Sequence, residues 1–154
     1  MASARRIYVD TSVFGGPFDE EFAEPSRQFF DEARAGRFTL LVSPVTRREL
    51  RLAPAEVRRL LADLPATLVE ELRMTRPVVV LRNRYIATKI LTSSQRNDAT
   101  HVAIATVSAA DLLVSWNFHD LVNLDRIKRY NAVNVDMGYQ RIEIRTPREA
   151  LRAD

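Results

Sequence analysis

The chain has 154 residues, of which 46% are hydrophobic, and a chain of this size buries enough surface to fold as one domain without disulfides. It contains no cysteine, which excludes disulfides, thiolate chemistry and cysteine zinc sites, and no apolar run approaches the ~20 residues of a membrane span. Lysine and arginine number 23 against 20 acidic residues, a mild positive bias that is compatible with nucleic acid without demonstrating it. We expect residues 1–154 to form a single cytoplasmic domain, because the first residues, MASARR, lack the apolar core of a signal peptide.

The first half of the chain is predicted to alternate strands and helices. Short apolar runs between turn residues predict strands, and apolar residues at helical spacing after a capping residue predict helices. In chain order these are a strand at Ile7–Val9, a helix from Ser26 to Ala35, a strand at Phe38–Ser43, a helix from Ser43 to Leu52 and a helix from Ala55 through Leu61. Gly15, Gly16 and Pro17 indicate turns after the first strand, and Gly36 is a stop for the first helix.

The second half continues the alternation. In chain order it contains Pro77–Leu81 as a short strand or the approach to a helix, a helix from Asn83 to Leu91, a helix beginning at Asp98, a strand at Asp111–Asn117, a short helix from Leu121 to Arg129 and a strand at Arg141–Pro147. The helix after Asp98 is rich in alanine, and small side chains allow close packing against a sheet. The order of elements predicts an α/β fold with three layers, α/β/α, and a mainly parallel central sheet.

Polar side chains follow the predicted strands. Asp10 comes directly after the first strand, and ligands of open α/β sheets bind beyond the carboxyl ends of the strands. Glu49 on the next helix, Asp98 at a helix start and Asn117 at the end of a strand are expected to reach the same edge. Converging carboxylates repel one another and need a cation, and oxygen ligands suit Mg²⁺ or Mn²⁺. Such ions support hydrolysis of phosphodiesters.

Each of these residues also has a structural interpretation. A strand-end Asp commonly caps a turn, a helical Glu is usually solvated, and Asp98 suits the first turn of a helix because of the helix dipole. His101 lies one turn after Asp98 and could face the site, but it is interpreted as a packed histidine with one satisfied nitrogen rather than as a general base. His119 is a similar, more exposed case. Trp116 is interpreted as a packing residue, although an aromatic side chain near a site could stack on a base.

A group of arginines surrounds and follows Glu49. On a helix, positions 47, 51 and 58 share roughly one side, and a solvated basic face is the default interpretation. If this face borders the acidic pocket, it would hold an RNA backbone, and binding would fall steeply with salt. The arginines are Arg47, Arg48, Arg51, Arg58 and Arg59.

The stretches together resemble PIN-domain nucleases over nearly the whole chain. The segment IYVDTSVF resembles the family's opening, LLVSPVTRREL its second element, NDATHVAIATVSAADLLVSWNFHDL its third and longest motif, and IEIRTPREAL its final strand and Pro turn. The resemblance implies a PIN-like fold and a ribonuclease that depends on Mg²⁺ or Mn²⁺. Many single-domain members are VapC-like toxins of toxin–antitoxin pairs, so it also implies an RNA substrate, an antitoxin protein partner and a homodimer.

Carried over residue by residue, the resemblance implies that Asp10, Glu49 and Asp98 bind the metal. Ser12 would hydrogen-bond within the site and orient Asp10 or a metal-bound water. The family usually has a fourth acid where this chain has Asn117, and an amide brings no charge, so a second metal would be held more weakly. Asp120, three residues further on, is a candidate replacement for that acid.

Two alternatives remain open from the sequence. A catalytically weak or inactive PIN-like scaffold that binds RNA or a protein partner is favoured by Asn117. A phosphatase with Asp10 as its nucleophile is disfavoured, because the Asp-x-Asp arrangement is missing and position 12 is Ser12.

Overall fold

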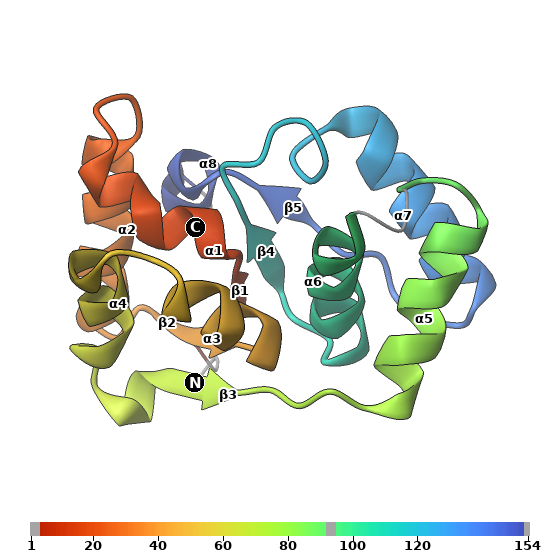
Figure 1. The fold of residues 1–154 in the computed structure, drawn as a ribbon, viewed down its shortest axis with the longest axis horizontal. Coiled ribbons are helices and arrows are strands. Elements are labelled where there is room, and N and C mark those ends of the chain that lie inside the picture. The colour runs from red at the N-terminus through yellow and green to blue at the C-terminus, as the bar shows by residue number, and fades with distance from the viewer. Residues whose placement is uncertain (1–3, 92–94, 153–154) are drawn as a thin grey trace.

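The central sheet of the protein is entirely parallel in the computed structural model, which describes residues 4–91 and 95–152. The strand order within it is β3-β2-β1-β4-β5, with β1 in the middle. Helices cover both faces of this sheet, so the predicted α/β fold with a parallel central sheet is confirmed (Figure 1). The strands are β1 (Arg5–Val9), β2 (Phe38–Val42), β3 (Val69–Glu71), β4 (Leu112–Val114) and β5 (Ile144–Arg145).

At least one helix separates each strand from the next along the chain. The α-helices are α1 (Thr11–Gly15), α2 (Ala23–Arg34), α3 (Pro44–Arg51), α4 (Ala55–Ala62), α5 (Arg76–Ala87), α6 (Arg96–Val107), α7 (Leu124–Asp136) and α8 (Pro147–Arg152), with 3-10 turns at Gly16–Phe18 and Ala66–Leu68. In the parts of the chain that the structure describes, no helix has the length and apolar character needed to cross a membrane.

The sheet separates two cores, because successive side chains of a strand point to opposite faces. Ile7 and Val9 of β1 pack with the phenylalanines of α1 and α2, and we call this side the phenylalanine face. Tyr8 points the other way, into a core with Tyr85 and Tyr130 that α5, α6 and α7 cover, and we call this side the tyrosine face. Both faces of β1 are therefore buried, which explains its continuous apolar run.

Helix ends follow the expected capping chemistry at several positions. Ser43 precedes α3, and its side chain accepts a hydrogen bond from the backbone N–H of Thr46 at 3.3 Å, as an N-cap does. Gly36 ends the α2 region with a φ of 78°, a left-handed conformation that glycine adopts without strain. The prediction of Gly36 as a stop is therefore confirmed.

Of the two alternatives for Pro77–Leu81, the strand is wrong and the helix is closer, because these residues lie inside α5. Pro77 is in the first turn of α5, where its missing N–H costs no helical hydrogen bond. The strand that sequence reasoning missed is β3, an edge strand that pairs only with β2. Its residues Glu70 and Glu71 break the apolar pattern, and charged side chains are common on edge strands.

The expected N-cap at Ser26 is also corrected, since α2 begins at Ala23 and Ser26 lies buried within it. Its hydroxyl accepts a hydrogen bond from the indole N–H of Trp116 at 2.9 Å. Gly15 and Gly16 belong to helical turns rather than to a loop. A Cβ on Gly16 would lie 2.0 Å from the Ser26 hydroxyl, so only glycine fits there without displacement.

Candidate metal centre at the carboxyl edge of the sheet

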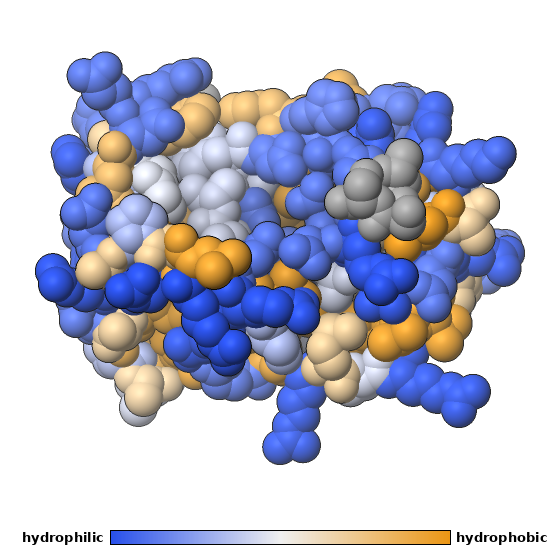
Figure 2. All heavy atoms as spheres, in the orientation of Figure 1, coloured by the Kyte–Doolittle hydropathy of each residue, from blue (hydrophilic) through white to orange (hydrophobic). Residues whose placement is uncertain are grey.

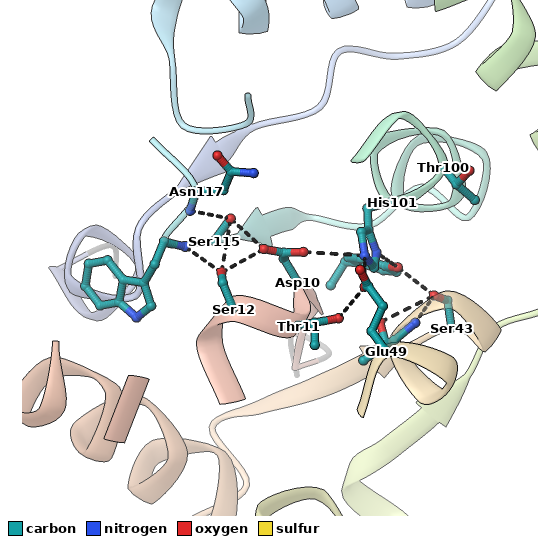
Figure 3. Close-up of polar contacts among 12 residues, drawn as sticks. Asp10, Thr11, Ser12, Ser43, Glu49, Thr100, His101, Ser115 and Asn117 are labelled. Carbon is teal, nitrogen blue, oxygen red and sulfur yellow. Dashed lines mark hydrogen bonds and ion pairs between the residues drawn. The ribbon is translucent and has the colours of Figure 1, made fainter. Parts of the chain in front are cut away.

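Asp10 lies where β1 ends, and only 5% of its surface is exposed. Its backbone N–H donates to the Val114 carbonyl at 3.0 Å, and its carbonyl accepts from the N–H of Val13 at the start of α1. Its Oδ2 accepts hydrogen bonds from Ser12 Oγ at 2.7 Å and Ser115 Oγ at 2.8 Å (Figure 3). The strand thus delivers the carboxylate to the edge of the sheet, and two hydroxyls fix one of its oxygens.

Glu49 and His101 meet Asp10 at this edge (Figure 3). His101 Nε2 lies 2.8 Å from Glu49 Oε1 and 3.4 Å from Asp10 Oδ1. The same Glu49 oxygen accepts a hydrogen bond from Thr11 Oγ1 at 2.7 Å. One ligand atom from each of Asp10, Glu49 and His101 lies within 4.8 Å of the other two. We call these three residues the strand-end cluster.

The second nitrogen of His101 is held from the opposite side. Nδ1 lies 2.5 Å from the Tyr8 hydroxyl, which in turn lies 2.7 Å from Ser43 Oγ. Since Ser43 also caps α3, this chain of contacts joins the start of α3 to the strand-end cluster. His101 and Tyr8 are both fully buried, and their rings meet edge to face with centroids 5.6 Å apart. The imidazole is therefore held at both nitrogens.

Burial and hydrogen bonding oppose each other in setting the charges of the cluster. Burial by itself raises the pKa of Glu49, but hydrogen bonds from His101 and Thr11 outweigh it and hold that pKa below its usual value. Burial lowers the pKa of His101, but the neighbouring Tyr8 hydroxyl and the two carboxylates outweigh it and raise that pKa well above its usual value. Glu49 and His101 therefore shift each other's pKa in opposite directions.

Asp98 lies in the first turn of α6, one turn before His101. Burial, together with the nearby carboxylates of Asp10 and Asp120, raises the pKa of Asp98 to about 6. The carboxylates of the strand-end cluster therefore influence the pKa of Asp98. Among the described residues, however, the set of three closely spaced ligand atoms contains His101 and not Asp98.

Asn117 stabilises the turn that follows β4. Its backbone N–H donates to Ser115 Oγ at 2.9 Å, and its side-chain oxygen accepts from the backbone N–H of Asp120 at 3.0 Å. The Asp120 carboxylate accepts from Gln95 Nε2 and contacts His119 Nδ1, both at 2.7 Å. The amide of Asn117 and the carboxylate of Asp120 are thus engaged in local contacts beside the site.

Trp116 packs against the helices of the phenylalanine face, as predicted. Its indole stacks on Phe22 with ring centroids 4.2 Å apart, and 8% of its surface is exposed. Its backbone N–H donates to Ser12 Oγ at 2.9 Å, and Ser12 donates to Asp10. The packing of this residue therefore supports the hydroxyl that orients Asp10.

Arginines of α3 and α4 line one groove, although they belong to two helices and not to one helical face. Arg47, Arg51 and Arg58 border it together with apolar residues of both helices. Arg47 pairs with Glu71, and Arg58 donates to the carbonyl of Ala53 at 2.5 Å. Hydrophilic side chains extend over this part of the surface (Figure 2). The groove is basic and lies along the helix that carries Glu49.

The direct contact of His101 with Glu49 and Asp10 is what sequence reasoning missed. The signal was its position three residues after Asp98, because residues three apart lie on the same side of a helix. The contact with Tyr8 could not be anticipated in the same way, since it joins residues 93 positions apart.

Comparisons with known proteins support the fold. No family model matches the sequence, and no curated protein matches it. The crystal structure of FitAcB from Neisseria gonorrhoeae is similar over 92% of this chain and 97% of that chain, with a TM-score of 0.55 and 15% sequence identity. At this identity the similarity shows the fold alone, and that fold is consistent with the PIN-like architecture.

Proposed function

We propose that this protein is a metal-dependent endoribonuclease with a PIN-like fold, and that it is the toxin of a type II toxin–antitoxin pair. The observation that carries the proposal is the meeting of Asp10 and Glu49 at the carboxyl edge of a parallel sheet, with Asp98 in the first turn of the adjoining helix. Ligands of such sheets bind at this edge. The motif resemblance to PIN-domain nucleases supports the same assignment.

The donor set fits a divalent cation, because carboxylate oxygens of Asp10 and Glu49 meet at one edge of the sheet and the Asp98 carboxylate lies near enough to respond to their charge. We assign Asp10, Glu49 and Asp98 to Mg²⁺ or Mn²⁺, which when bound would activate water and neutralise charge on a phosphodiester. Ser12 and Ser115 hold Oδ2 of Asp10, and its other oxygen, Oδ1, faces His101. The groove arginines would hold the RNA backbone, which predicts weaker binding at higher salt.

The toxin role is a separate step of the proposal. It rests on the resemblance to VapC-like proteins, which also implies a cytoplasmic location, a homodimer and an antitoxin partner. A small DNA-binding protein encoded beside this gene should co-purify with the chain and inhibit its ribonuclease activity. An active nuclease without such a neighbouring gene would refute the toxin role and leave the enzymatic proposal standing.

The enzymatic proposal is tested by RNA cleavage with Asp10→Asn and Asp98→Asn. Both variants should lose Mn²⁺-dependent cleavage while keeping the circular dichroism spectrum of the wild type. Asp125→Asn is the matched control, because it makes the same change on an exposed carboxylate that pairs with Arg129 on α7. Retained cleavage by both pure site variants would refute the assignment.

The alternative function, a scaffold that binds RNA or protein without cleaving it, is favoured by one observation. Asn117 replaces a carboxylate with a neutral amide whose oxygen already accepts from the N–H of Asp120. Asn117→Asp distinguishes the two functions. An enzyme should show activity in the wild type that the substitution only adjusts, whereas a scaffold should show none before the substitution.

A further inference from the structure

His101 has the geometry of a metal ligand. Its Nε2 lies 2.8 Å from one carboxylate oxygen and 3.4 Å from another. Neighbouring ligands of an octahedral ion are about 3 Å apart when the metal–ligand distances are about 2.1 Å. The two distances from Nε2 are therefore close to those between adjacent corners of one coordination shell, and all three ligand atoms of the strand-end cluster lie within 4.8 Å of one another.

The surroundings of His101 match those of a metal-bound histidine. Such a residue donates its second ring N–H to a fixed partner, which sets the tautomer and the ring orientation. Here the Tyr8 hydroxyl contacts Nδ1, and Ser43 in turn contacts Tyr8. With Nδ1 bonded to Tyr8, Nε2 points toward Glu49 and Asp10.

The two carboxylates are oriented in the same manner. Asp10 is held through Oδ2 by two serine hydroxyls, and the oxygen that faces His101 is Oδ1. Glu49 is held at Oε1 by Thr11. The buried position of His101 leaves its ring no other orientation, since both nitrogens are engaged. All three ligand groups are thus fixed by neighbours outside the cluster.

We infer that His101 Nε2 is the nitrogen ligand of the proposed metal centre, and that the centre therefore selects Mn²⁺ over Mg²⁺. A metal-bound imidazole coordinates through an unprotonated nitrogen, which here would be Nε2. Imidazole nitrogen favours transition metals, whereas Mg²⁺ prefers oxygen ligands. This inference rests on the proposed function and names the ligand and metal preference that the sequence pattern did not.

The test uses the chain's two histidines, His101 and His119. The His119 side chain is 79% exposed and contacts Asp120 rather than the strand-end cluster. The full-length His119→Gln variant thus keeps a single histidine. Mn²⁺ bound to it is examined by pulsed electron paramagnetic resonance, which detects coupling to a ligating nitrogen. Growth with ¹⁵N-histidine then changes that coupling without any further substitution.

We expect Mn²⁺ bound to His119→Gln to show a ¹⁴N coupling that becomes a ¹⁵N coupling in the labelled protein. Bound Mn²⁺ without histidine coupling would overturn the inference and leave the nuclease proposal intact. Failure to bind Mn²⁺ at all would overturn both.

The metal preference is measured separately with His101→Gln, whose fold is checked by circular dichroism. This variant should lose at least ~10-fold in Mn²⁺ affinity, with a much smaller change for Mg²⁺. An equal loss for both ions would overturn the stated preference. If His101→Gln does not fold, competition between Mn²⁺ and Mg²⁺ on the His119→Gln protein decides the point, and equal affinities overturn the preference.

Discussion

The two faces of the central sheet are built from different kinds of interaction. The phenylalanine face is mainly apolar, and its aromatic rings pack with centroids 4.8 to 5.6 Å apart. The rings are those of Phe14, Phe29, Phe30 and Phe38. Such packing stabilises the fold through area removed from water, without needing any particular hydrogen bond.

The tyrosine face instead buries polar groups that are paired with one another. Tyr8 contacts His101, Tyr85 donates to Asn134, and the Tyr130 hydroxyl donates to the Asp120 carbonyl. Within residues 4–91 and 95–152, every buried side-chain nitrogen or oxygen has a hydrogen-bond partner. A buried polar group is costly without one.

The phenylalanine face thus mainly stabilises the fold, whereas the tyrosine face also positions side chains of the site. Alternate residues of β1 serve the two purposes, since Ile7 and Val9 enter the apolar core while Tyr8 reaches the histidine of the site. Substitutions on the phenylalanine face should therefore leave the site geometry unchanged as long as the protein stays folded. Substitutions on the tyrosine face should disturb the site geometry even where they reduce stability only slightly.

The largest effect on stability is expected from Phe29→Ala on the phenylalanine face. Removing this fully buried ring leaves a cavity and should lower the free energy of unfolding by about 3–5 kcal/mol. Urea denaturation measures the change. Under native conditions the folded protein should keep the Mn²⁺ affinity of the wild type. A weaker affinity in the folded protein would show that the two faces are not separate.

A smaller loss of stability with a larger effect on the site is expected from Tyr8→Phe. It removes only the hydroxyl between Ser43 and His101, at a cost of about 1–3 kcal/mol. Because the imidazole loses its fixed partner, Mn²⁺ affinity should fall by ~10-fold or more.

Tyr85→Phe is the matched control for that substitution. Tyr85 is also fully buried on the tyrosine face, but its hydroxyl donates to Asn134. We expect a comparable loss of stability and unchanged Mn²⁺ affinity, measured by calorimetry. Equal losses of affinity in the two variants would mean that Tyr8 acts only through the core.

The smallest effect on stability is expected from Asp98→Asn, and this effect depends on pH. Burial raises the pKa of Asp98 from its usual 3.8 to about 6, so the folded state binds more protons than the unfolded state between these values. Stability should therefore fall as pH rises through this interval. Because part of the group is solvated, we expect Asp98→Asn to gain only about 1 kcal/mol at pH 7.

Urea midpoints at pH 4 and pH 7 in metal-free buffer check this expectation. The difference in stability between variant and wild type should be larger at pH 7 than at pH 4. The same substitution should abolish cleavage, so a gain in stability would accompany a loss of function. A constant difference at both pH values would contradict the raised pKa.

Sequence periodicity was enough to predict the α/β class and the position of Asp10, because both depend on local patterns. It failed at β3, whose two glutamates belong to a short edge strand that only its pairing with β2 reveals. It left Pro77–Leu81 open between a strand and the approach to a helix, and this apolar run of strand length lies in a helix. Short apolar runs do not distinguish the two states.

The site was predicted only as far as its acids. Asp10 and Glu49 follow strands that lie next to each other in the sheet, so their meeting could be expected from topology. Helical spacing from Asp98 indicates the side of α6 on which His101 lies, but its contacts with Tyr8 and Glu49 depend on tertiary packing, which no local pattern encodes. The roles of Asp98, Asn117 and Ser12 in the reaction remain predictions.

The central claim is that a divalent cation binds at Asp10. Isothermal titration of Mn²⁺ into metal-free wild-type protein and into Asp10→Asn tests it, with circular dichroism to check that both are folded. We predict binding by the wild type and its loss in the folded variant. Equal Mn²⁺ binding by both proteins, or binding by neither, would contradict the account.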